Sequence, residues 1–166
     1  MINEPRRPAD THREPDALGV LAAFLTAARE AVIAKATGVT EDQGRTPGVD
    51  SGTSLYGLIQ HLAAAETYWF EVVLLGTDRP VDLGMDVPAT ATGPDLIADY
   101  QTAAARSDAN IAAAGDPLAL STGTKQPPRT LQWIVAHMIQ ETARHAGHAD
   151  ILRENIDGTT GHKLRP

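Results

Sequence analysis

The chain has 166 residues, enough for one domain, and a net charge of −7 from 21 acidic and 14 basic residues. Because phosphate contacts need clustered Lys and Arg, which the sequence lacks, we expect no nucleic-acid partner. Cysteine is absent, which excludes disulfides, Cys-ligated metal centres and a cysteine nucleophile, and fits a reducing, cytoplasmic location.

Residues 1–15 hold three prolines and many charged residues, which predicts a flexible N-terminal tail. This segment has no apolar signal core. The longest apolar stretches of the chain are interrupted by polar residues well short of a membrane span. The sequence therefore predicts a protein without a membrane partner.

The first predicted helix covers residues 16–37, with Asp16 as its N-cap and Gly38 at its end. Residues 38–52 are rich in glycine and form a predicted loop. The second predicted helix covers residues 54–75 and ends at Gly76. Both helices carry apolar side chains at steps of three and four residues, which is typical of an amphipathic helix. On the second helix these side chains are Leu55, Leu58, Leu62, Ala65, Trp69, Val72 and Val73.

A long segment without helix or strand periodicity, residues 76–93, leads to the third predicted helix, residues 94–114. Thr92 is its expected cap, and Asp95 favours the positive end of the helix dipole. A second proline-rich loop covers residues 116–129. The fourth predicted helix covers residues 130–156, from the N-cap Thr130, and a C-terminal tail covers residues 159–166.

No segment alternates with the two-residue period of a strand. Four amphipathic helices over residues 16–158 predict an all-α fold, a four-helix bundle. The long loops leave room for a crossover connection, so spacing alone leaves the order of the helices open.

Histidines gather on two of these helices. His61 lies at the edge of the apolar arc of the second helix, so its side chain is expected to point into the bundle. At 100° per residue, His137, Glu141, His145 and His148 occupy one arc of about 80° on the fourth helix. His145 falls within the apolar stripe of that helix, and Glu141 lies on its edge.

Burying a carboxylate and two imidazoles is costly unless a charge satisfies them, and a divalent metal ion can do so. Glu141 and His145, four residues apart, present donor atoms on one face, and His61 would be the third ligand. Three protein ligands leave a position open, as in catalytic zinc sites. The alternative is a site without metal, in which His145 is hydrogen-bonded in the core and Glu141 pairs with Arg144 or Arg106. His137 and His148 would then be surface groups or would orient ligands.

Two runs resemble a known family: SLYGLIQHLAAAETYWF, residues 54–70, and LQWIVAHMIQETARHAGHADILRENIDG, residues 131–158. They are similar to the DinB-like superfamily, and most similar to its "mini-circle protein" branch. The resemblance implies a four-helix bundle with a non-sequential helix order and a three-ligand metal centre at one end. Most members use three histidines, whereas here Glu141 stands at one of the three positions. The His/Glu/His set resembles that of mycothiol-dependent maleylpyruvate isomerase.

The ligands that this resemblance implies are His61, Glu141 and His145, with zinc as the first choice of metal and nickel or iron as others. It implies a transferase or isomerase that uses a low-molecular-weight thiol such as mycothiol. Arg144 and His148 could hold an anionic substrate or orient ligands, and Tyr68 could line the pocket. Two further hypotheses are a metal-dependent hydrolase and a non-catalytic metal-binding or stress-response protein.

Some apolar side chains fall away from the predicted core arcs. They could form the contact surface of a homodimer, or they could instead pack within a bundle of crossing helices. They are Ile59, Phe70 and Leu74 on the second helix and Trp133 on the fourth. Trp69 could line the pocket with Tyr68, but its place on the apolar arc favours the core.

Overall fold

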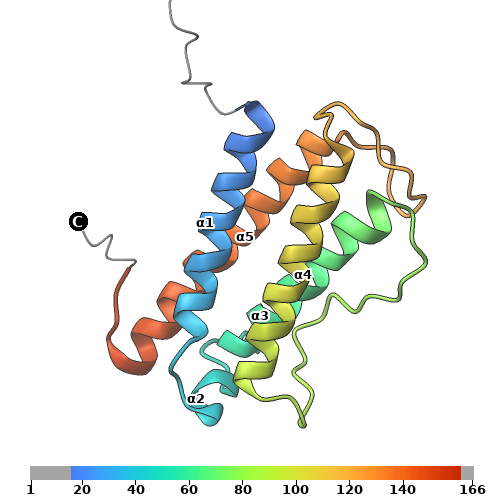
Figure 1. Ribbon diagram of the computed structural model, residues 1–166. Helices are drawn as coiled ribbons and strands as arrows, with labels where there is room; N and C mark the ends of the chain where they lie inside the picture. The colour runs from blue at the N-terminus through green and yellow to red at the C-terminus, as the bar shows by residue number, and fades with distance from the viewer. Residues whose placement is uncertain (1–15, 162–166) are drawn as a thin grey trace, which may run out of the picture.

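The computed structural model describes residues 16–161 (Figure 1). Its helices are α1 (Ala17–Ala36), α2 (Glu41–Arg45), α3 (Leu55–Thr67), the π-helix η1 (Tyr68–Val73), α4 (Gly93–Ala114) and α5 (Leu131–Asp157). Over these residues the structure has one isolated β-bridge and no strand, which confirms the all-α fold. The predicted N-terminal tail and most of the C-terminal tail lie outside the described residues.

The four long helices form a bundle whose order differs from their order in the chain. Helix α1 packs mainly against α5, and α3 packs mainly against α4 (Figure 1). Helices α3 and α4 run parallel, because Gly93 at the start of α4 lies against Tyr56 at the start of α3. Further along, Arg106 of α4 donates a hydrogen bond to Glu71 of η1. The consecutive helices α4 and α5 barely touch, which confirms the non-sequential order.

The predicted N-caps of three long helices are confirmed. Asp16 accepts a hydrogen bond from the Gly19 backbone N–H at 2.7 Å, and Thr92 and Thr130 cap α4 and α5 in the same way. The sequence analysis missed the short helix α2, which lies inside the predicted loop 38–52. A reciprocal pair of hydrogen bonds between Thr40 and Gln43 begins it.

The second predicted helix is not one continuous α-helix. After Thr67 it continues as η1, where the Leu74 N–H donates to the Trp69 carbonyl five residues earlier, at 3.0 Å. Such a turn holds one more residue than an α-turn and rotates the side chains that follow. Phe70 and Leu74 consequently lie in the core, 0% and 4% exposed, whereas Trp69 is half-buried at its side.

The predicted homodimer surface is therefore wrong for three of its four residues. Phe70 and Leu74 are buried because of η1. Ile59 is buried because the first turns of α3 are enclosed by α1, α2 and α4. Trp133 alone is exposed as expected, at 39%. Trp69, expected in the core, is only half-buried.

A buried ion pair joins three helices. Arg29 of α1 donates from Nε and Nη2 to the two carboxylate oxygens of Glu66 of α3, both at 2.7 Å. Its Nη1 donates to Asp108 of α4, also at 2.7 Å. Burial acts to lower the pKa of Arg29, but the two carboxylates outweigh it and raise that pKa above its usual value. The arginine is therefore held charged inside the bundle.

Helix α1 is long and apolar enough to cross a membrane by length and composition, contrary to the expectation from sequence. Its most apolar stretch is interrupted by few charged residues. However, it packs along α5, and its Arg29 is paired inside the bundle with Glu66. The structure thus places α1 as a bundle helix.

The loop before α5 is fastened to the end of η1. The backbone N–H groups of Thr122 and Gly123 donate to the carbonyls of Leu74 and Val73, at 3.0 and 2.9 Å. A Cβ atom on Gly123 would overlap the carbonyl oxygens of Val72 and Val73. Only glycine lets the two backbones approach this closely.

We expect Gly123→Ala to lower the free energy of unfolding by about 1–3 kcal/mol, because a methyl group must push the loop away from η1. Urea denaturation followed by circular dichroism measures this. Gly147→Ala is the matched control: Gly147 lies within α5 with open space around it, so alanine should stabilise the helix by up to about 1 kcal/mol. Equal stability of Gly123→Ala and the wild type would contradict the close approach.

Candidate metal centre

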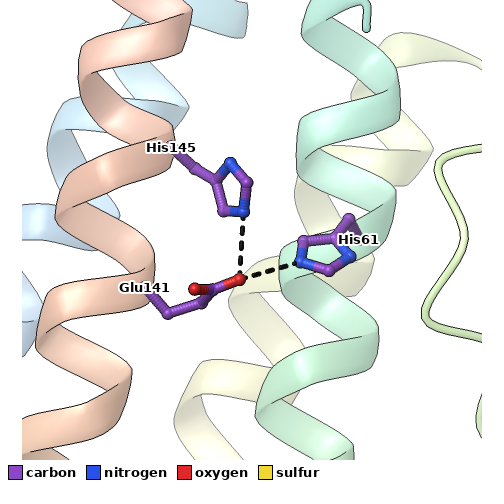
Figure 2. A group of neighbouring side chains, drawn as sticks. All are labelled: His61, Glu141 and His145. Atoms are coloured by element: carbon purple, nitrogen blue, oxygen red, sulfur yellow. Dashed lines mark hydrogen bonds and ion pairs between the residues drawn. The ribbon is translucent and has the colours of Figure 1, made fainter. Parts of the chain in front are cut away.

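Helices α3 and α5 bring together the three residues that the sequence analysis named as ligands (Figure 2). His61 lies midway along α3, and Glu141 and His145 lie one turn apart on α5. Glu141 Oε1 is 3.3 Å from His61 Nε2 and 3.1 Å from His145 Nε2. One ligand atom from each residue lies within 4.8 Å of the other two.

A carbonyl oxygen in the crossover loop fixes the orientation of His61. His61 Nδ1 lies 2.7 Å from the Leu83 carbonyl oxygen. Because a carbonyl only accepts hydrogen bonds, Nδ1 carries the proton, and in the neutral ring Nε2 presents its lone pair to Glu141. Metal-binding histidines are typically oriented by such a bond from the nitrogen that does not bind the metal.

Two acceptors that face each other at 3.3 Å repel unless a proton or a cation lies between them. Burial lowers the pKa of His145, and the His61 ring adds to this effect, so the neutral imidazole is favoured despite the charge of Glu141. Burial raises the pKa of Glu141. When a proton lies between Glu141 and His61, hydrogen bonds from the two histidines and the charge of Arg144 outweigh burial and hold this pKa below its usual value. A carboxylate and two neutral imidazoles are the protonation states that bind metal.

The spacing of the ligand atoms suits a divalent cation. In a tetrahedral zinc site, bonds of about 2.0–2.1 Å put neighbouring ligand atoms about 3.3 Å apart. The two Glu141 distances, 3.3 and 3.1 Å, are close to that value. Two imidazole nitrogens and one carboxylate oxygen suit zinc, and also nickel or iron. These residues therefore fit the group that the sequence analysis expected.

The other predicted site residues surround this centre at different depths. Arg144 is exposed and lies 3.4 Å from Glu141 Oε2, so one of the two alternative ion pairs is present. Arg106 instead pairs with Glu71 at 2.8 Å. The exposed His148 touches the far side of His145, with 3.4 Å between their Nδ1 atoms.

His148 also borders a cavity of about 280 Å³ with mostly apolar walls. Its other lining residues are Val49, Ser51, Thr53, Ile151 and Leu152. Tyr68 lies at the start of η1, seven residues after His61, and its hydroxyl accepts a hydrogen bond from Gln126 at 3.1 Å. An apolar cavity thus lies beside His148, and Tyr68 lies next to the aromatic ring of Trp69.

The sequence analysis missed a group of stacked rings next to the centre, which we call the aromatic face: Trp69, Trp133 and His137. The His137 ring stacks on Trp133 with an interplanar angle of 4° and 5.2 Å between centroids. Trp69 lies 4.4 Å from His137 and 5.7 Å from Trp133. The spacing of four residues from Trp133 through His137 to Glu141 was a visible signal, but the position of Trp69 depends on η1.

The sequence profile of a family described as Mycothiol-S-transferase matches residues 20–158. The chain belongs to this family. It is a DinB-like family, so the resemblance seen in the sequence is confirmed. No curated protein matches the chain.

Among solved structures, the chain is similar to one described as a conserved protein of locus from Enterococcus faecalis. The TM-score is 0.63 at 15% sequence identity, over 86% of this chain and 98% of that chain. At this identity the likeness shows a shared fold.

We expect His137 to titrate below the ordinary histidine pKa of about 6.5. Burial under the two tryptophans is the main cause, and the charge of Glu141 opposes it only in part. Because the unfolded chain binds this proton more tightly, His137 should reduce stability as the pH falls through the ordinary value. NMR titration of the ring protons measures the pKa, and Trp133→Ala should raise it. A wild-type pKa at or above 6.5 would contradict the burial described here.

Proposed function

We propose that this mycothiol-S-transferase family member binds a divalent cation, zinc in the first place, through His61, Glu141 and His145. We further propose that it joins mycothiol, or a related small thiol, through its sulfur to an electrophilic carbon in the cytoplasm. The observation that carries the proposal is the convergence of three ligand atoms, with the Nε2 atoms of His61 and His145 on either side of Glu141 Oε1, and with His61 oriented by the Leu83 carbonyl.

A cation held by three protein ligands would favour the thiolate over the thiol form of a bound thiol. The thiol must come from solution, because the chain has no cysteine. In the overall reaction the thiol loses its S–H proton, a carbon–sulfur bond forms, and a leaving group departs with its electron pair. The exposed imidazole of His148 can accept the proton, and the exposed Arg144 can attract an anionic electrophile. The apolar cavity beside His148 can receive the electrophile's carbon skeleton.

Partial exposure supports a catalytic use over a purely structural one. The side chains of His61 and Glu141 are 15% and 19% exposed, so small molecules can reach them. The buried core lies in two apolar clusters that do not depend on these side chains. A hydrolase is less well supported, because Glu141 faces both histidines as a ligand, and His137, a candidate base, is covered by tryptophans.

Zinc titration against a competing chelator tests the binding step. We expect His61→Ala and Glu141→Gln to weaken zinc affinity by at least about tenfold to a hundredfold. Glu154→Gln is the matched control, because Glu154 is an exposed carboxylate on the same helix. Unchanged affinity in Glu141→Gln would contradict the proposed ligand set.

The transfer step is tested with zinc-loaded protein, mycothiol and a chromogenic electrophile that loses a halide on attack. We expect His145→Ala to lower the rate by about a hundredfold or more, because one ligand is lost. Equal turnover by both proteins would remove the metal centre from the reaction. Loss of the helices on chelation, followed by circular dichroism, would indicate a structural role instead.

A further inference from the structure

The aromatic face lies against the metal centre in a continuous row along α5. Trp133, His137, Glu141 and His145 follow one another at steps of four residues. Each step rises about 6 Å along the helix, so Trp133 lies about 12 Å from Glu141 along its axis. Trp69 of η1 completes the face from the neighbouring helix. The row therefore extends from the ligands over about the length of two sugar rings.

The exposed edges of this face are available to a ligand, although Arg129 and His137 both lie over the Trp133 ring. Trp133 is 39% exposed, and Trp69 and His137 are half-buried. Within residues 16–161 neither indole N–H has a hydrogen-bond partner in the protein, so both are free to donate. The guanidinium of Arg129 lies 4.4 Å from the Trp133 ring centroid and adds further donors at the far end.

The π-turn of η1 supports a binding use for Trp69. In an uninterrupted α-helix this side chain would fall on the core side, where the sequence analysis expected it. Within η1, Phe70 lies in the core and Trp69 lies half-buried against His137. Turns of this kind are unfavourable and occur frequently at functional sites.

We propose that the aromatic face binds the carbohydrate part of the thiol whose sulfur is held at the metal centre. This inference rests on the proposed function, and it names the part of the substrate that the protein recognises. In mycothiol the thiol belongs to an N-acetylcysteine group, which is amide-linked to an amino sugar joined to inositol. Faces of such rings are rich in C–H groups, which pack on aromatic rings, while their hydroxyls accept hydrogen bonds from indole N–H groups and from arginine.

The row of side chains from Trp133 to His145 ends at His145 in a less polar environment. Beyond His145 lie His148 and the apolar cavity, which offer few donors to a sugar. The polar, ring-lined end and the apolar end thus suit different reactants, the thiol's carbohydrate and the electrophile. This arrangement would let the protein distinguish a glycosylated thiol from cysteine or N-acetylcysteine.

Intrinsic fluorescence reports on this face directly, because Trp69 and Trp133 are the two tryptophans of the chain. The probe is the thiol-free pseudodisaccharide, glucosaminyl-inositol. We expect a saturable change in wild-type fluorescence and in His145→Ala, and an affinity at least about tenfold lower in Trp133→Ala. Phe24→Ala, which removes a 63% exposed ring on α1, is the matched control and should bind as the wild type does. Absence of binding to the wild type, or equal binding by Trp133→Ala, would overturn the proposal.

Steady-state kinetics separate this proposal from the proposed function. For mycothiol, Trp133→Ala and Trp133→Leu should raise KM by about tenfold and leave kcat within about twofold. For N-acetylcysteine, neither variant should change KM. An equal change for both thiols would mean a general disturbance of the site and would contradict carbohydrate recognition. If the wild type transfers neither thiol, the proposed function fails, and the sugar titration still decides the role of the aromatic face.

Discussion

The parallel direction of α3 and α4 is the constraint on which the candidate site depends. Two parallel neighbours need a connection that returns along the whole length of the bundle, and residues 74–92 provide it (Figure 1). That return path carries the Leu83 carbonyl to His61 and so sets which nitrogen of the ring is protonated. It also leaves α5 beside α3, where Glu141 meets His61 and Trp133 meets Trp69. A sequential up-and-down bundle would separate these pairs.

The structure buries two carboxylates on α3 and α5 in contrasting ways. Glu66 is fully buried, and a guanidinium meets both of its oxygens at 2.7 Å, so its charge is compensated within the protein. Glu141 has only a distant, exposed arginine at 3.4 Å, and both of its closest neighbours are imidazole nitrogens. The first arrangement is complete as it stands. The second has room for one more positive charge, which is the physical basis of the proposed metal centre.

Sequence patterns predicted the four long helices, three of their caps and the three side chains that meet between α3 and α5, because helical period and the Glu/His spacing on one helix are local properties. They could not predict the π-turn, because a helical wheel assumes 100° per residue throughout and so cannot represent a turn with one extra residue. Phe70, Trp69 and Leu74 lie in or directly after that turn, and the burial of Phe70 and Leu74 differs from what the helical wheel predicts. The contact of His61 with Leu83 was also out of reach, because the crossover loop has no periodicity from which to place it.

The pairing of Arg29 with Glu66 has a geometric consequence for the bundle as a whole. If α1 slid along α3 by one helical turn, a side chain would move by about 5.4 Å. Both hydrogen bonds from Arg29 to Glu66 would break, and two opposite charges would be left unpaired in an apolar interior. Apolar contacts alone tolerate such slippage far better, since alanine-rich surfaces offer many near-equivalent fits. The ion pair therefore fixes the axial alignment of α1 and α3: it selects one alignment among several of similar packing quality.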